Sequence, residues 1–101
     1  MNTPSSLTID ERVAVVAGHI ERRVGPLCFV LAPDGQMHSF DNATAVEIWD
    51  LLVAAGAAGT NIRELARALG AAFEVEEAVA VDDIRGMLEG LVLRCVVQRV
   101  G

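Results

Sequence analysis

The sequence predicts a single α+β domain with a winged helix-turn-helix-like arrangement, in which a three-stranded antiparallel sheet precedes a three-helix bundle. The length of 101 residues suits one hydrophobic core. The first half of the chain consists of short β-type segments separated by turn residues, and the second half changes to the spacing of helices. Hydrophobic residues make up 52% and charged residues 22% of the chain, a composition typical of folded proteins rather than disordered ones.

The N-terminal residues lack any regular pattern. Residues 1–11 carry no apolar periodicity, so we expect a flexible arm, followed by one domain over residues 12–101. Residues 13–16 are apolar and contiguous, which fits either a short strand or a docked arm, and the sequence does not decide between them.

Turn residues divide the next segment into three strands. Residues 19–24 and 27–31 contain β-branched or aromatic side chains, and the Gly-Pro pair at 25–26 indicates a hairpin between them. A second turn, Pro-Asp-Gly at 33–35, reverses the chain into a third strand at residues 36–40. We therefore expect an antiparallel meander.

Two helices follow the meander. Asn42 can cap the first helix, or Thr44 can, with Glu47 three residues later completing a capping box. Thr60 can cap the second helix. The predicted apolar faces consist of Ala45, Ile48, Trp49 and Leu52 in the first helix and of Ile62, Leu65, Ala66 and Leu69 in the second.

A third helix is predicted at about residues 76–92, and its apolar side chains form two lines rather than one. The first line is Ala80, Ile84, Met87 and Leu91, and the second, about 100° further around the axis, is Val81, Leu88 and Val92, interrupted by Arg85. So wide an arc either packs between the other helices and the sheet or leaves part of the second line open as a groove. Residues 95–100 are predicted to form a short C-terminal strand that either adds to the sheet or folds over the core.

The overall charge argues against two classes of partner. A net charge of −6 opposes the phosphate backbone of nucleic acids. No apolar run approaches the roughly 20 residues that span a bilayer, and residues 1–11 lack the basic end and apolar stretch of a signal peptide. We therefore predict a cytoplasmic protein without a membrane or nucleic-acid partner, in which Cys28 and Cys95 are buried free thiols.

No group of residues matches a catalytic or metal site. His19 and His38 lie on predicted strands without a motif around either, and together with Cys28 and Cys95 they match no metal-ligand spacing. The adjacent carboxylates at 82–83 point about 100° apart on a helix and so do not form a working pair. We predict no enzymatic activity, no cofactor and no metal.

Three helical stretches carry a resemblance to a known family. They are residues 42–52 with their Asn-x-Thr-Ala start, residues 62–69, and residues 81–91, in which an Asp-Ile pair keeps an Asp-Val spacing. In these residues the chain resembles the PqqD-like family, recognition domains that hold the leader segment of ribosomally made peptides while a partner enzyme modifies the core segment. The resemblance covers about residues 19–97.

The chain departs from the family pattern at two places. Asp41 stands where the family usually has Leu, so we expect Phe40 to take the core position by a shift of one residue. Residues 56–59 lengthen the loop between the first two helices.

The resemblance implies that a leader peptide adds as an extra strand beside the third strand, in a groove walled by the third helix. The implied edge is Gln36, Met37, His38, Ser39 and Phe40, and the implied wall is Val81, Arg85, Leu88 and Val92 with Asp82 and Glu89 at its rim. Arg85 either pairs with an acidic leader side chain or forms an intrahelical pair with Asp82 or Glu89. The implied partners are a precursor leader peptide and a modifying enzyme, a maturase or a leader peptidase.

Other interpretations of the same elements stay open. A winged-helix DNA-binding regulator would use the third helix for recognition, although Asp82, Asp83 and Glu89 on that helix repel phosphates. A scaffold subunit would dock an enzyme through the edge strand without holding a leader peptide. The same open edge also allows a homodimer.

Overall fold

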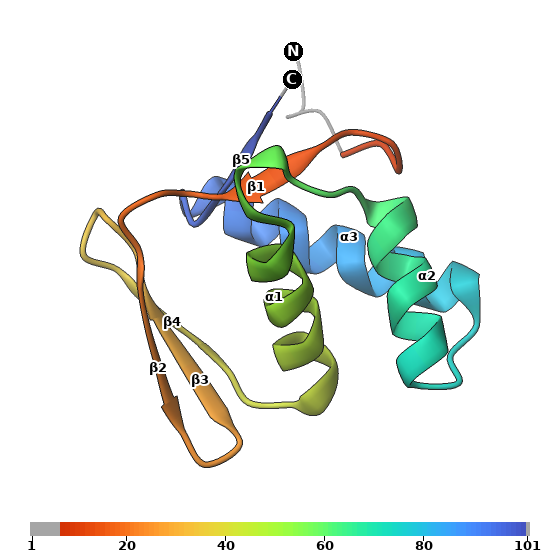
Figure 1. Cartoon of the computed structure of the whole chain (residues 1–101), viewed down its shortest axis with the longest axis horizontal. Helices are drawn as coiled ribbons and strands as arrows, with labels where there is room; N and C mark the ends of the chain where they lie inside the picture. The colour runs from red at the N-terminus through yellow and green to blue at the C-terminus, as the bar shows by residue number, and fades with distance from the viewer. Residues whose placement is uncertain (1–6, 101) are drawn as a thin grey trace.

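Turn chemistry folds the first half of the chain into the predicted meander. In the computed structural model, which describes residues 7–100, strands β2 (Ile20–Val24), β3 (Leu27–Leu31) and β4 (Met37–Phe40) pair antiparallel in the order β2-β3-β4 (Figure 1). The first turn contains Gly25 and the second contains Gly35, with positive φ angles of 58° and 92° that glycine adopts without steric cost.

A separate two-stranded sheet joins the two ends of the domain. Strand β1 (Val13–Val15) pairs antiparallel with β5 (Val97–Arg99). Residues 13–16 therefore include a strand, and the C-terminal strand pairs with it rather than adding to the meander, which resolves both choices that the sequence left open.

A tight turn at the end of helix α3 (Glu77–Leu93) directs the chain into β5. The Cys95 N–H donates to the Val92 C=O (3.1 Å) and the Val96 N–H to the Leu91 C=O (3.0 Å), the two bonds of a Schellman motif. Cys95 has the left-handed φ of 61° that this motif requires, and its side chain is exposed, contrary to the predicted burial.

Asparagine side chains begin helices α1 (Ala43–Ala55) and α2 (Ile62–Ala72). Asn42 Oδ1 accepts the Ala45 N–H at 2.8 Å, which confirms Asn42 as the cap and excludes Thr44, a residue of the first turn. In α2 the prediction of Thr60 was wrong by one residue, because Asn61 Oδ1 accepts the Glu64 N–H at 2.8 Å.

Pairing with β1 is the reason that Thr60 is not the cap. Its N–H and C=O both bond to Val13, at 2.9 and 2.8 Å, so Thr60 belongs to a β-bridge rather than to the helix. The preceding Gly59 allows this approach, since a Cβ atom there would lie 2.5 Å from the Val13 carbonyl oxygen. Between α1 and this bridge, the extended loop forms a short 3-10 helix, η1 (Gly56–Ala58).

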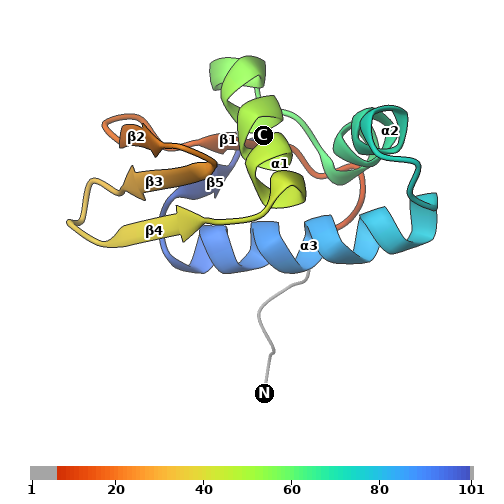
Figure 2. The same ribbon diagram turned by 90° about the horizontal axis from the view of Figure 1, so that it is seen from below.

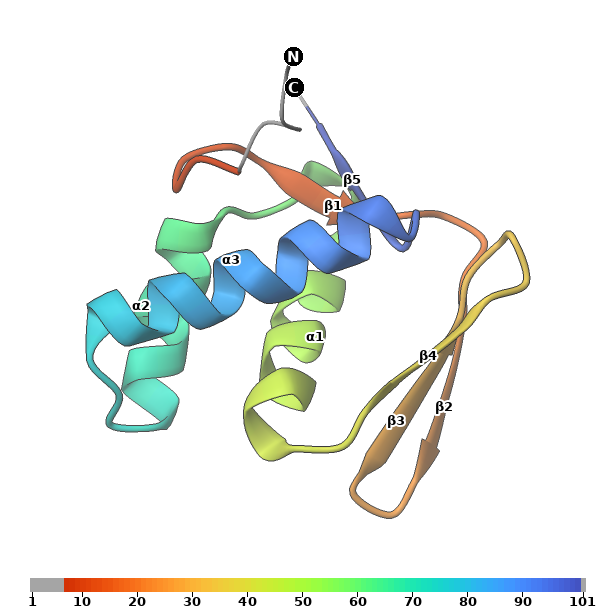
Figure 3. The same ribbon diagram turned by 180° about the vertical axis from the view of Figure 1, so that it is seen from behind.

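The helices form a layered core with α3 as its longest member. Seen from behind, α3 runs across α1 and α2 (Figure 3), and from below β4 is the strand of the meander nearest to α3 (Figure 2). The core is almost entirely apolar. Its largest fully buried side chains are Trp49, Leu7, Ile48, Leu52, Ile62, Leu65, Leu69, Ile84, Leu88, Val13, Val30 and Val96.

Trp49 on α1 attaches the meander to the helices. Its fully buried ring stacks on Phe40 of β4, with centroids 5.5 Å apart. Its indole Nε1–H donates to Glu21 Oε1 on β2 at 2.8 Å. This hydrogen bond lowers the pKa of the Glu21 carboxyl, because it favours the charged form.

Removing the charge of Glu21 tests this attachment. Because the pKa of Glu21 is lowered in the folded protein, its contribution to stability is present above its usual value of 4.5 and is lost as the pH falls through the lowered pKa. We expect Glu21→Gln, which keeps an oxygen acceptor for Trp49, to lose this part of the pH dependence. Glu21→Ala leaves a buried indole N–H unpaired and should cost about 1–3 kcal/mol at neutral pH.

Urea unfolding followed by the fluorescence of Trp49, the chain's one tryptophan, measures both effects. The difference in unfolding free energy between the wild type and Glu21→Gln should shrink on acidification below pH 4.5. A difference that stays constant with pH would contradict the role assigned to the Glu21 carboxylate.

Candidate functional site

The meander leaves β4 with an unpaired edge. β4 is the last strand in the order β2-β3-β4, and no other strand in residues 7–100 pairs with it. An edge strand presents free N–H and C=O groups that an extended segment can pair with. This edge is the one that the sequence singled out.

The hydrogen bonds to β3 determine which residues of β4 face that edge. The Ala32 N–H donates across the turn to the C=O of the residue before β4 (2.8 Å). Hydrogen-bonded pairs recur at every second residue of an antiparallel ladder, so His38 and Phe40 direct their backbone groups toward β3. Met37 and Ser39 therefore direct their N–H and C=O groups outward.

The side chains of β4 alternate between the two faces of the sheet. Met37 (61% exposed) and Ser39 point to solvent, whereas His38 and Phe40 are each 8% exposed. Phe40 is thus in the core, as expected. Nε2 of His38 is buried and has no hydrogen-bond partner in residues 7–100. Gln36 lies in the turn before the strand and is exposed to solvent.

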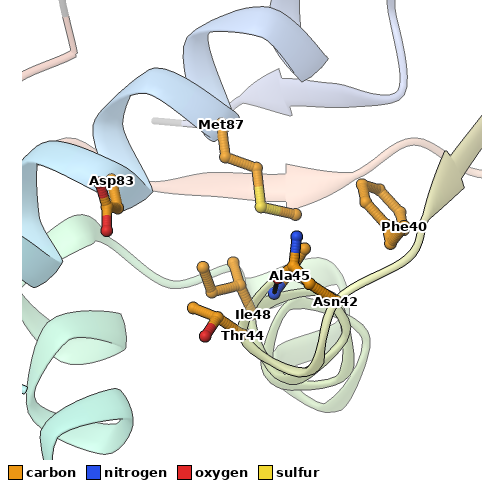
Figure 4. Close-up of a pocket in the computed structure, with 7 residues that line it drawn as sticks. All are labelled: Phe40, Asn42, Thr44, Ala45, Ile48, Asp83 and Met87. Carbon is orange, nitrogen blue, oxygen red and sulfur yellow. Dashed lines mark hydrogen bonds between the residues drawn. The ribbon is translucent and has the colours of Figure 1, made fainter. Parts of the chain in front are cut away.

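A cavity of about 410 Å³ lies where β4 ends and α1 begins, facing α3. Its volume is within the range of small-molecule and side-chain pockets. Figure 4 shows Met87 of α3 reaching toward Phe40 and Ile48, with Asp83 one turn earlier on the same helix. The lining residues of this β4–α3 cavity are Phe40, Asn42, Thr44, Ala45, Ile48, Asp83 and Met87.

Helix α3 has a flank on each side of its buried face, and the two flanks have different neighbours. The buried face consists of Ala80, Ile84, Leu88 and Leu91. At about 100° per residue, Asp83 and Met87 fall on the flank beside the cavity. Val81, Arg85, Glu89 and Val92 fall on the opposite flank. The structure thus brings β4 together with Asp83 and Met87, and not with the predicted wall.

Two members of the predicted wall have other neighbours. Leu88 is 0% exposed and belongs to the core, so it offers no surface to a guest in this structure. Val92 lines a second cavity, which lies beside Cys95 and β5. Val81 is half-buried against the core, and Asp82 is exposed.

The opposite flank of α3 binds the chain's own N-terminal strap, residues 7–12. Leu7 is 2% exposed, its N–H donates to Glu89 Oε2 (2.9 Å), and its C=O accepts from Arg85 Nε (3.1 Å). Arg85 also lies 3.8 Å from Asp82, so the intrahelical pair considered for it is present. These contacts occupy Arg85 of the wall that the resemblance implied and Glu89 at its rim.

An ion pair fastens the strap to α2. Arg63 binds both carboxylate oxygens of Asp10, at 2.8 and 3.2 Å, and this hydrogen bonding lowers the pKa of Asp10. The Arg63 N–H also donates to the Ile9 C=O (3.0 Å). Residues 7–11 are therefore docked rather than the flexible arm that the sequence predicts, and the remainder of that prediction lies outside the described residues.

Sequence reasoning missed Asp83 and Met87 as neighbours of β4. It placed Met87 in the first apolar line of the third helix and considered Asp83 only as a carboxylate beside Asp82. A usable signal was present, since the two residues are four apart and share one side of the helix. What the pattern lacks is the orientation of the helix relative to the sheet.

The titratable residues bear on metal binding and on thiol reactivity in the part of the chain that the structure describes. Residues 7–100 contain no group of three or more His, Cys, Asp or Glu side chains that could hold a metal ion. Burial raises the pKa of the Cys28 thiol, which makes it a poor nucleophile. None of the helices in this range is long and apolar enough to cross a membrane.

The fold is a small winged helix-turn-helix-like α+β domain in which β4 is an edge strand. The chain belongs to the family described as coenzyme PQQ synthesis protein D (PqqD), whose family model matches residues 28–97. No curated protein sequence matches the chain.

Two solved structures share the fold. One is TbiB1 in complex with the TbiA(beta) leader peptide, with a TM-score of 0.74 and 18% identity, over 87% of this chain and 98% of that one. The other is the PqqD truncation of Methylobacterium extorquens PqqCD, described as a stand-alone RiPP recognition element. It has a TM-score of 0.72 and 24% identity, over 92% of this chain and 95% of that one.

Truncation of Leu7 tests whether the strap is part of the fold. Leu7→Ala removes a buried side chain and should lower the free energy of unfolding by about 2–5 kcal/mol. Leu93→Ala is the matched control, because Leu93 is 75% exposed and its loss should change stability by less than about 0.5 kcal/mol. Urea unfolding compares them, and equal stabilities would show that the strap does not support the domain.

Proposed function

We propose that this domain binds the leader segment of a ribosomally made precursor peptide as an added strand beside β4 and presents it to a separate modifying enzyme. The observation that carries the proposal is the open edge of β4 next to the β4–α3 cavity, in a chain of the PqqD family. Strand addition explains how such an edge gains affinity from backbone hydrogen bonds and specificity from side-chain pockets.

The register of β4 determines how a guest strand would lie. The outward N–H and C=O groups of Met37 and Ser39 are the ones that pair with the guest backbone. Residues directly opposite in a sheet point to the same face. A guest residue opposite Phe40 therefore points inward, toward Met87 and the cavity, and the residue opposite His38 points to the same side.

The two structural relatives support the proposal by what their descriptions say of them. TbiB1 was solved with a leader peptide bound, and the Methylobacterium extorquens domain is described as a functional recognition element. We carry this role to the present chain through the shared family and the shared edge. The peptide contacts that we propose are Met37 and Ser39 on the edge and Phe40, Asp83 and Met87 around the cavity.

The proposed role needs no chemistry from this chain. Affinity comes from the strand edge, and the reaction belongs to the partner enzyme, a maturase or a leader peptidase. The corresponding location is the cytoplasm, where ribosomes make the precursor. Reduced thiols are normal in that compartment, and Cys28 and Cys95 are both free.

A proline at Ser39 tests strand addition directly. Ser39→Pro removes an outward N–H without breaking a bond to β3, and the ring also obstructs a guest backbone. We expect at least roughly a tenfold loss of affinity. Fluorescence anisotropy with the labelled leader of the precursor encoded nearest this gene measures it.

Ser39→Ala is the matched control, because it removes the exposed hydroxyl but keeps the N–H. Its affinity should equal that of the wild type, and circular dichroism should show that both variants fold. Unchanged affinity in a folded Ser39→Pro protein would contradict pairing at β4. Absence of binding by the wild type would remove the main support for the proposed function.

A further inference from the structure

The β4–α3 cavity combines an apolar wall with one charged side chain. Phe40, Ala45, Ile48 and Met87 supply the apolar surface. Asp83 is the only ionisable residue in the lining, and its carboxylate extends from α3 at the side of the cavity (Figure 4). A long cationic side chain matches such a site, because its methylene stem lies on apolar surface while its charged end meets a carboxylate.

Asp83 has no structural role that would explain its position. Its carboxylate makes no hydrogen bond or ion pair within residues 7–100, whereas the neighbouring Asp82 pairs with Arg85. A carboxylate stabilises a helix through the macrodipole only in the first turn. Asp83 lies in the second turn of α3, which begins at Glu77, so that contribution is small.

The stretch of chain that supplies β4 and α1 is also poor in cations, and of its carboxylates Asp50 pairs with Arg23. Between Arg23 and Arg63 the sequence contains no Lys or Arg, and its only carboxylates are Asp34, Asp41, Glu47 and Asp50. Asp41 stands in the chain between two lining residues, Phe40 and Asn42. Arg85, the nearest cation along α3, is bound to the strap on the opposite flank. The lining of the cavity therefore contains one carboxylate and no cation.

We infer that the leader recognised by this domain places a Lys or Arg side chain in the β4–α3 cavity, and that Asp83 selects it. This inference rests on the proposed function and deepens it by naming the chemistry of the guest. The stem lies against Met87 and Ile48, and the ammonium or guanidinium group pairs with the Asp83 carboxylate. The guest residue that reaches the cavity is the one opposite Phe40 in the added strand.

The test is a selection of random short peptides displayed on phage, using the full-length chain as bait. Parallel selections use Asp83→Asn, Asp83→Lys and the matched control Asp82→Asn, which removes the adjacent charge outside the cavity. Wild type and Asp82→Asn should enrich Lys or Arg at one fixed position beside apolar residues. Asp83→Asn should lose this preference, and Asp83→Lys should reverse it to Asp or Glu.

Affinities of the selected peptides make the test quantitative. Asp83→Asn should weaken a selected peptide by about fivefold, as expected for an ion pair near the surface. Asp83→Lys should weaken it by roughly the square of that factor, and replacing the peptide's basic residue by Glu should restore binding to Asp83→Lys. Added salt should reduce the wild-type affinity more than that of Asp83→Asn.

The outcomes separate this inference from the proposed function. If the wild type enriches peptides without a basic residue at a fixed position, or if Asp82→Asn changes the preference as Asp83→Asn does, the inference is wrong and leader binding stands. If the wild type enriches no peptide and does not bind the encoded leader, the proposed function fails and the inference fails with it. Circular dichroism of each variant confirms that it is folded.

Discussion

The position of the meander depends on one residue of α1, Trp49. Its ring stacks on Phe40 at the end of β4, and its indole N–H bonds to Glu21 on β2. His19, just before β2, meets the ring edge-on with centroids 5.6 Å apart. These contacts reach both outer strands of the sheet, so they fix its orientation on the helices. The distance between the open edge of β4 and α3 follows from that orientation.

Helix α3 gains its own fixed orientation from the strap on its far flank. Glu89 and Arg85 hold both backbone groups of Leu7, and the Leu7 side chain is buried. Burial of a whole residue against two charged side chains resists rotation of the helix about its axis. The flank with Asp83 and Met87 is thereby kept toward β4. One flank of α3 thus binds the strap, and the other lines the cavity.

Local patterns were sufficient to predict the elements and insufficient to orient them. The meander and the three helices follow from turn residues and helical spacing, which act over a few residues. Capping chemistry offered Asn42 as one of two candidates for α1 and missed the cap of α2 by one residue. The wall of the site depends on the rotation of α3, and a helical period defines lines of side chains without saying which line faces the sheet. The docking of the strap could not be predicted from a local pattern, because it depends on Leu7 and on partners about eighty positions away in the sequence.

The open edge of β4 needs protection from other copies of itself. Natural sheets protect edges with short strands and with charges. β4 has only four residues, and a carboxylate lies on either side of it in the sequence, Asp34 before it and Asp41 after it. Antiparallel pairing of two such edges would bring Asp34 of one copy near the end of the strand that carries Asp41 in the other, so like charges would approach at both ends. A guest peptide without carboxylates at those places avoids this repulsion. In the proposed role, these carboxylates favour a guest of opposite charge over a second copy of the edge.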